Sequence, residues 1–322
     1  MCRGMTLVVE ANGIAKLFGQ LLAVDDLTVA LEAGEVLGIL GPNGAGKTTA
    51  VRMLTTILAP SRGSFSVAGI PHTRPEEIRR RIGVLPESAG YPGGQTGEEY
   101  LIYHARLYGY GAGRAREVAR SLLDELGLLE RARSPISAYS RGMRQRLGIA
   151  RALVNDPVAV FLDEPTLGLD PAGQRQVLRS VRTIARERGA AVLLSTHLLN
   201  EVEENCSHVL ILNRGRVISE GTVSDVVSRA AAPRRVRLQV APEEVERAAA
   251  ALAAEPGVGR VEPAEGESGW LRVELEANGH GNGAPNPNEP IRALLDAAIA
   301  LRSFEVDGTR LNDAFLAITE AS

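Results

Sequence analysis

Apolar positions along the first two thirds of the chain follow two different periods, which predict strands and helices in succession. The continuous apolar runs at 158–162 and 190–195 are typical of strands buried in a parallel sheet. Apolar residues recur every three to four positions over 49–58, 144–155 and 174–188, which predicts helices there. Strands that alternate with helices in this way indicate an α/β core with a parallel sheet.

Two other segments of the same region have their own patterns. Residues 6–34 carry alternating apolar positions and are expected to be rich in β-strand. Residues 96–133 have helical periodicity, and we place them in a helical subdomain that covers about 88–156.

A change of composition separates the last part of the chain from the rest. Three alanines and a proline occupy 230–233, and we expect a small α+β domain of roughly ferredoxin-like order over 234–322. Its predicted elements are strands at 236–240 and 270–276, helices at 242–254, 291–301 and 311–320, and a Gly/Asn/Pro-rich loop at 278–290. Trp270, the only tryptophan, is expected to pack in the core or at an interface.

Composition narrows the classes of function. The chain has 322 residues, 44% of them hydrophobic, which suits one large or two ordinary globular domains. A net charge of −3 gives no general reason to expect nucleic-acid binding. Cys2 and Cys206 match no metal or redox spacing, so a reducing compartment is expected. We expect neither a signal peptide nor a membrane span, because no apolar stretch has the required length.

A glycine-rich segment lies between the apolar run at 36–40 and the predicted helix at 49–58. It fits the pattern G-x-x-x-x-G-K-[ST] and consists of Gly41, Pro42, Asn43, Gly44, Ala45, Gly46, Lys47, Thr48 and Thr49. Between a strand and a helix, such a loop points backbone N–H groups inward around phosphates, and the start of the helix adds partial positive charge. Lys47 can then reach the β- and γ-phosphates, and the Thr48 hydroxyl can bind Mg²⁺. The alternative, a plain glycine-rich turn, leaves the Lys-Thr pair unexplained.

Two acidic residues and a histidine follow predicted buried strands. Asp163 and Glu164 come directly after 158–162, and His197 follows 190–195. Because the carboxyl ends of parallel strands line the ligand crevice, we expect Asp163 to hold Mg²⁺ and Glu164 to polarise a water molecule. His197 can donate to the γ-phosphate or orient the water, so it joins Lys47 and Glu164 as a predicted catalytic residue. The alternatives are two solvated carboxylates and a satisfied histidine at a strand end; for His197 taken alone, the second is the stronger interpretation.

Five motifs occur in a fixed order, and in that order they resemble a known family. After the phosphate loop come Tyr139-Ser140-Arg141-Gly142-Met143-Arg144-Gln145-Arg146-Leu147, Leu162-Asp163-Glu164-Pro165, Gly168-Leu169-Asp170 and Thr196-His197. Over residues 6 to about 225 the chain resembles the nucleotide-binding subunits of ABC transporters. The resemblance implies a P-loop NTPase core within a domain at 6–229, with an N-terminal antiparallel β-subdomain and a helical subdomain. It also implies ATP and Mg²⁺ as cofactors.

The same resemblance assigns further residues to the nucleotide. Phe18 is similar to the aromatic residue that stacks on adenine. The positions that resemble the signature loop, which in the family binds the γ-phosphate of ATP held by the other subunit, are Ser140, Arg141, Gly142 and Met143. Asp170 resembles the residue that links the two sites across the dimer. Since each motif occurs once in the chain, we expect an ATP-bound head-to-tail dimer with two composite sites.

Two positions depart from the family pattern. The signature has Tyr-Ser-Arg-Gly-Met at 139–143, where Leu-Ser-Gly-Gly-Gln is common. Glu87 stands where a glutamine usually senses Mg²⁺ and the permease; it joins Thr48 and Asp163 as a candidate metal ligand, although it adds negative charge near the γ-phosphate. Both departures resemble the subgroup that serves exporters of drugs, sodium ions, lipids or polysaccharides. The segment 308–316 is similar to the tail domain of drug-resistance-type members.

The resemblance implies an ATP-hydrolysing subunit of an exporter that drives a separate membrane permease through ATP-dependent dimerisation. Its expected partners are that permease and a second copy of itself or a homologous ATP-binding subunit, at the cytoplasmic face of the cell membrane. A DNA-repair or chromosome-structure ATPase would need a long coiled coil between the phosphate loop and the signature, for which 49–139 is too short. A ribosome-associated factor would usually have two cassettes and a basic linker. A plain regulatory ATP-binding protein would lack Glu164 or His197.

Five of the six tyrosines are clustered between positions 91 and 110. They follow Glu87, where the family docks its membrane subunit, and tyrosine suits an interface that is apolar on one side and wet on the other. Some of them are predicted to line a groove for a cytoplasmic helix of the permease; core packing of the helical subdomain is an equal alternative. They are Tyr91, Tyr100, Tyr103, Tyr108 and Tyr110.

Overall fold

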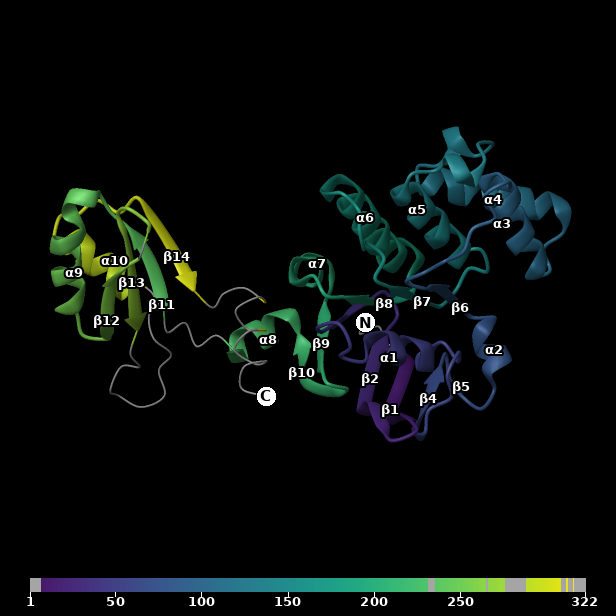
Figure 1. Cartoon of the computed structure of the whole chain (residues 1–322), viewed down its shortest axis with the longest axis horizontal. Helices are drawn as coiled ribbons and strands as arrows, with labels where there is room; N and C mark the ends of the chain where they lie inside the picture. Colours follow the sequence, from purple (N-terminus) through teal and green to yellow (C-terminus); the bar gives the residue numbers. More distant parts are fainter. Residues whose placement is uncertain are drawn as a thin grey trace, which may run out of the picture. The chain divides into compact units, whose positions relative to one another are not determined.

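The computed structural model describes residues 7–230, 235–264, 266–275 and 288–307, together with Leu311 and Phe315. The chain forms two compact units, Met1–Thr222 and Val223–Ser322, with α8 (Val223–Ala230) at the start of the second (Figure 1). No helix in the described ranges has both the length and the apolar character that a membrane crossing requires.

A ten-stranded mixed sheet organises the first unit, in the order β5-β4-β1-β2-β10-β9-β3-β8-β7-β6. The strands are β1 (Leu7–Phe18), β2 (Leu21–Glu32), β3 (Val36–Leu40), β4 (Arg62–Val67), β5 (Ile70–Pro71), β6 (Ile82–Leu85), β7 (Ala159–Asp163), β8 (Ala191–Thr196), β9 (His208–Asn213) and β10 (Arg216–Thr222). The pairs from β9 through β3, β8 and β7 to β6 are parallel, whereas β1 pairs antiparallel with both β2 and β4. The predicted parallel core and antiparallel N-terminal subdomain are therefore confirmed.

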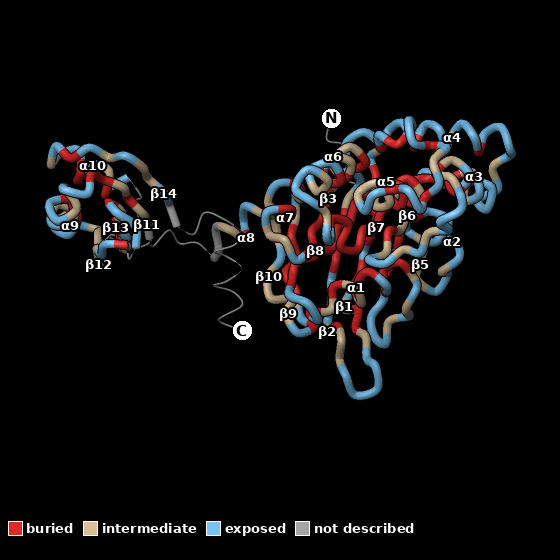
Figure 2. The backbone as a smooth tube through the Cα atoms, turned by 45° about the horizontal axis from the view of Figure 1, so that its top comes forward, coloured by how far each residue is buried: buried red, intermediate tan, exposed pale blue. Residues whose placement is uncertain are grey.

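Burial explains why the central strands read as continuous apolar runs. Every residue of β3, β7 and β8 is buried, because side chains on both faces of the sheet pack into hydrophobic clusters. In Figure 2 these strands form the buried centre, and the helices around them are exposed on their outer sides. The covering helices of the first unit are α1 (Lys47–Leu54), α2 (Pro75–Arg79), α3 (Gly97–Leu107), α4 (Ala112–Glu125), α5 (Arg141–Ala152), α6 (Pro171–Arg188) and α7 (Leu199–Asn205).

Capping residues decide where two functional helices begin. The Ser140 Oγ accepts from the Met143 N–H at 3.2 Å and starts α5, and the Asp170 Oδ1 accepts from the Gly173 N–H at 3.3 Å and starts α6. Both helices begin three residues before the predicted positions, because the caps extend them toward the N-terminus. Helix α1 is also displaced from its predicted range, since it starts at Lys47 directly behind the phosphate loop and ends at Leu54.

The second unit contains a four-stranded antiparallel sheet in the order β12-β13-β11-β14. Its elements are β11 (Arg235–Gln239), α9 (Val245–Ala253), β12 (Val258–Pro263), β13 (Trp270–Leu275), α10 (Glu289–Asp296) and β14 (Ser303–Asp307). This is the predicted ferredoxin-like order, with β12 as a strand that the pattern did not indicate. Trp270 is half-buried, and the Arg237 guanidinium lies 4.6 Å from the centre of its ring. The expected loop at 278–290 and helix at 311–320 lie mostly outside the described residues.

Candidate nucleotide site

The phosphate loop between β3 and α1 requires glycine at two positions for different reasons. A Cβ on Gly41 would lie 2.3 Å from the Leu212 carbonyl oxygen, a distance that no side chain tolerates. Gly46 has a φ of +107°, and a Cβ there would lie 2.6 Å from the Ala23 carbonyl oxygen. The loop therefore has a fixed shape, which is set by close backbone neighbours on β2 and β9.

Lys47 is the first residue of α1, and its ammonium group turns back over the loop. Nζ donates to the carbonyl oxygens of Gly41 at 2.8 Å and Pro42 at 3.3 Å. It also forms an ion pair with Glu164 Oε1 at 3.3 Å, and both side chains are less than a tenth exposed. A buried charge is stable only when paired and hydrogen-bonded, so this geometry holds the cation at the mouth of the loop.

The two carboxylates at the end of β7 have different surroundings. Asp163 is buried; its Oδ1 accepts from Ser195 Oγ at 2.5 Å and from Thr48 Oγ1 at 3.3 Å. Glu164 has a φ of +48°, which is uncommon for a residue other than glycine, and its N–H donates to the Ser195 carbonyl oxygen at 3.1 Å. The reversed backbone turns Glu164 away from Asp163, so the second carboxylate faces Lys47.

His197 completes a row of interacting side chains. Its Nδ1 lies 2.8 Å from Glu164 Oε2, and about a third of the imidazole is exposed. Lys47, Glu164 and His197 therefore form a continuous row, although they come from α1 and from the ends of two different strands. The structure thus brings together the three residues that were predicted to be catalytic.

These groups line a cleft of about 710 Å³. Its walls contain Asn43, Gly44, Ala45, Gly46, Lys47, Thr48, Thr49, Glu87, Glu164 and His197, all predicted from sequence, and also Leu21, Leu22, Ala23, Leu167, Arg214 and Gly215. The additional residues come from β2 and from turns that no phosphate-binding motif includes, so only the folded sheet shows their place. Their apolar members give one side of the cleft the character that a nucleotide base requires.

The oxygen groups around Thr48 fit a magnesium ion that is bound together with phosphates. Thr48 Oγ1 and Asp163 Oδ1 are neighbours, and Glu87 lines the same cleft. Within the described ranges, no group of three or more His, Cys, Asp and Glu side chains could hold a metal by itself. Mg²⁺ usually takes one or two protein oxygens and completes its shell with water and phosphate, which matches this donor set.

Phe18 does not line the cleft, in contrast to the position expected for an adenine-stacking residue. It lies at the end of β1 with nearly half of its surface exposed, and Lys16 Nζ is 5.5 Å from the centre of its ring. Its partner across the hairpin, Leu21, is the residue that reaches the cleft. Phe18 is therefore beside the nucleotide cleft, and its proposed contact with adenine requires the hairpin end to turn inward.

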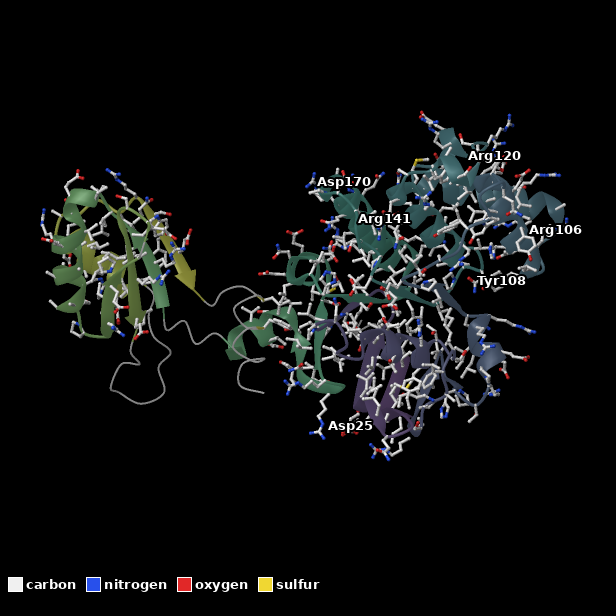
Figure 3. The ribbon with its side chains drawn as sticks, viewed as in Figure 1. Asp25, Arg106, Tyr108, Arg120, Arg141 and Asp170 are labelled. Atoms are coloured by element: carbon white, nitrogen blue, oxygen red, sulfur yellow. The ribbon has the colours of Figure 1, made fainter. Side chains whose placement is uncertain are left out.

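The signature residues line a second cleft, of about 440 Å³, which shares no residue with the first. Ser140, Arg141, Gly142 and Asp170 are among its lining residues (Figure 3 labels Arg141 and Asp170). A Cβ built on Gly168 would lie 2.5 Å from Arg141 Cζ, so the guanidinium packs against the backbone of the loop before α6. Met143 does not line this cleft; it packs against the hydrophobic core because it follows Ser140 by one helical turn on the inner side.

The clustered tyrosines have mixed environments. Tyr100 is 4% exposed and belongs to the core, so the expected groove position is wrong for this residue. Tyr91 is half-buried, its hydroxyl donates to the Arg144 carbonyl at 2.9 Å, and burial raises its pKa to about 12. Tyr103 and Tyr108 are about half exposed. A groove of about 310 Å³ is lined in part by Ile57, Arg79, His104, Tyr108 and Arg151.

Comparisons with known proteins agree with this geometry. The family described as "ABC transporter" matches residues 24–167. The daunorubicin/doxorubicin resistance ATP-binding protein DrrA of Streptomyces peucetius is 38% identical over 98% of this chain and 93% of its own length. The bacitracin transport ATP-binding protein BcrA of Bacillus licheniformis is 36% identical over 67% of this chain and 70% of its own length. A solved ATP-binding subunit of an ABC transporter superposes with a TM-score of 0.62 and 31% identity, covering 69% of this chain and 92% of that one.

The protein belongs to the family of ABC transporter ATP-binding subunits. It is an ATP-binding and ATP-hydrolysing subunit, and the phosphate loop with its neighbouring carboxylates is the part of the fold that this activity requires.

Proposed function

We propose that the 710 Å³ cleft binds ATP with Mg²⁺ and that Glu164 and His197 promote attack of water on the γ-phosphate. The observation that supports this most directly is the row Lys47–Glu164–His197, in which one glutamate joins the phosphate-binding lysine to the histidine. Entering phosphates give Lys47 a new anionic partner, so Glu164 becomes available to accept a proton from water. Phe18 would contact the adenine.

The protein side of the metal site consists of Thr48 and Asp163, with Glu87 on the opposite wall. Mg²⁺, when bound, would neutralise charge on the β- and γ-phosphates. The Ser195 hydroxyl holds Asp163 through a bond of 2.5 Å and so orients the carboxylate toward Thr48.

The signature cleft would bind the γ-phosphate of ATP held by a second subunit. Ser140, Arg141 and Gly142 lie at the start of α5, where backbone N–H groups and the helix dipole favour an anion. Arg141 is exposed and forms no ion pair within the described ranges, so its charge is available to a partner. Asp170 begins the adjacent α6 and would link the two sites, and Met143 would support the loop from the core.

Light scattering of the Glu164→Gln variant tests the head-to-tail dimer. We expect this variant to dimerise with Mg-ATP because it binds nucleotide without cleaving it. The matched control, Glu164→Gln with Lys47→Ala, should remain monomeric under the same conditions. A Glu164→Gln protein that stays strictly monomeric at saturating ATP would contradict the dimer.

We further propose that the groove beside α3 docks a helix of an integral membrane permease, which would hold the protein at the cytoplasmic face of the membrane. Ile57 and Tyr108 are both substantially exposed on this groove, and Tyr103 and Leu107 on the same helix region are also exposed. Such a patch of large apolar side chains marks an interaction surface.

Co-purification with the permease encoded beside this chain tests the docking groove. Ile57→Asp with Tyr108→Asp should abolish co-purification and leave ATP binding intact. Leu129→Asp, at an exposed apolar position of the 3₁₀ turn Leu129–Arg131, is the matched control and should retain the permease. Full retention by the double variant would reject this groove.

The relatives also indicate the direction of transport and the kind of cargo. DrrA, which is similar along nearly the whole chain, is named for resistance to daunorubicin and doxorubicin. We therefore propose export of an amphipathic drug-like molecule. Cells that express this protein with its permease should accumulate less daunorubicin than cells with the Glu164→Gln variant, and equal accumulation would contradict this cargo.

A further inference from the structure

A buried carboxyl group lies beneath the turn that carries His197. Glu201, in α7, is 5% exposed and belongs to none of the recognised motifs. Among the described residues it forms no ion pair with lysine or arginine. Because burial of a carboxyl group is costly without compensating hydrogen bonds, its partners indicate what it does.

Those partners stand on both sides of His197. The Thr196 Oγ1 donates to Glu201 Oε2 at 2.8 Å, and the same oxygen accepts from the Leu198 N–H at 3.1 Å. The Glu201 N–H in turn donates to the Leu198 carbonyl oxygen at 3.2 Å. The residues before and after His197 are thus tied to one side chain, which fixes the backbone of the turn between them.

The helix that carries Glu201 is itself firmly held. Asn205 Nδ2 donates to the Glu201 carbonyl oxygen at 2.7 Å, and Arg182 of α6 donates to Asn205 Oδ1 at 2.6 Å. On the sheet side, a Cβ on Gly38 of β3 would lie 2.9 Å from Val202 Cγ1, so α7 is in close contact with the strand. Glu201 therefore holds the turn from a fixed base.

The second oxygen of the carboxyl group faces the loop after Glu164. Glu201 Oε1 and Thr166 Oγ1 are each buried without a hydrogen-bond partner among the described residues. Burial raises the pKa of Glu201, the Thr166 and Thr196 hydroxyls oppose that rise, Glu164 adds to it and His197 lowers it. A proton on Oε1 would let it donate to Thr166 Oγ1, which gives both buried atoms a partner.

We propose that Glu201 is a positioning residue for ATP hydrolysis: its carboxyl group holds the turn of His197 at the distance from Glu164 that water attack requires, and joins this turn to the loop that leads to Asp170. The inference rests on the roles proposed above for Glu164 and His197. Glu201 contacts neither nucleotide nor water, so it acts only through the residues that it holds.

Steady-state ATPase measurements on the full chain with its permease test this role. Glu201→Leu should lower kcat by up to about 100-fold, since displacement of a catalytic group by about 1 Å has an effect of this size. The KM for Mg-ATP should remain within about twofold, because no phosphate contact is lost. Glu201→Gln should restore kcat, since its amide supplies both a donor and an acceptor in the same place.

Thr196→Val removes only the hydroxyl that Glu201 holds, and it covers the possibility that Glu201→Leu does not fold. It should lower kcat in the same way, and the double variant should be no worse than the stronger single variant, because the two residues act as one unit. Glu204→Leu, an exposed glutamate on the same helix, is the matched control and should behave as wild type.

The possible results separate this inference from the proposed function. If His197→Ala is inactive while Thr196→Val and Glu201→Leu turn over at the wild-type rate, the positioning role is overturned alone. If Glu201→Gln is as slow as Glu201→Leu, the negative charge is what matters and the proposal also fails. If His197→Ala itself keeps full activity, the hydrolytic role proposed for this site is wrong.

Discussion

The two clefts of the first unit differ in how far their side chains are already committed to one another. In the nucleotide cleft, Lys47, Asp163 and Glu164 are all more than nine-tenths buried and are linked by ion pairs or hydrogen bonds. In the signature cleft, Ser140, Arg141 and Asp170 are exposed, and their hydrogen bonds only begin helices. The first cleft is organised by its own chain, whereas the second presents groups that its own chain does not use.

This difference teaches how one chain can contain both halves of a site and still lack a complete one. Buried charged groups need fixed partners, so they can be prepared in advance for phosphates. Exposed groups at a helix start remain hydrated until a ligand replaces the water. In the dimer proposed above, the first kind of cleft supplies the chemistry and the second kind senses that a partner is present.

The largest effect should follow from breaking the committed cleft at Glu164. Glu164→Gln keeps the shape but removes the base, so kcat should fall by about 10²- to 10⁴-fold while nucleotide binding persists. Turnover by phosphate release and binding by titration with a fluorescent ATP analogue would measure the two quantities separately. A variant that loses binding and turnover together would show that Glu164 serves mainly to hold Lys47.

Mixing two inactive variants tests whether the clefts belong to different half-sites. Lys47→Ala disables the first cleft, and Gly142→Glu places a carboxylate in the second, where the nearest atom to a new Cβ is Leu169 Cδ2 at 3.9 Å. Each variant alone should be inactive in phosphate release. An equal mixture should recover about a quarter of wild-type turnover, because half of the dimers then have one intact composite site.

The control for this experiment is a mixture of Lys47→Ala with Glu164→Gln, which both alter the same cleft. Each mixed dimer then has a defect in both of its composite sites, so no turnover should return. Recovery in the control, or none in the first mixture, would contradict the division into half-sites.

A smaller effect should appear in stability when one residue of each cleft is truncated. Ser195→Ala removes the 2.5 Å bond to buried Asp163, so the free energy of unfolding should fall by about 1–3 kcal/mol. Arg141→Ala removes an exposed side chain and should remain within about 0.5 kcal/mol of wild type. Urea unfolding of both variants gives the two values; equal losses would mean that the signature cleft is as internally committed as the first.

The sequence predicted the committed cleft better than the exposed one, for a physical reason. Asp163 and Glu164 follow an apolar run, and Lys47 stands in a loop whose glycines are required by close backbone contacts, so short local patterns identify all three. Met143 occupies a motif position, yet helix geometry turns it into the core. Local order along the chain cannot show which face of a helix meets solvent.

Residues that act through tertiary contacts were also missed. Ser195 and Glu201 are ordinary residues in the sequence, and only the packing of β8 and α7 places them beside Asp163 and Thr196. The five clustered tyrosines illustrate the same limit, because composition could not separate buried Tyr100 from exposed Tyr108. Phe18 was assigned by resemblance to a position that depends on how the end of a hairpin turns.

The comparison also predicts the opposite effect where a buried group lies beside a charge of the same sign. His104 is half-buried, and burial together with nearby Arg151 lowers its pKa from 6.5 to about 4. The folded state therefore resists a proton that the unfolded chain accepts, so stability is complete above about pH 6.5 and falls as the pH decreases toward 4. His104→Gln should flatten this part of the profile by about 1 kcal/mol, a value that allows for the exposed half of the ring. Urea unfolding of both proteins from pH 7 to pH 4 measures the difference, and parallel profiles would show that His104 takes up its proton in the folded state as readily as in the unfolded chain.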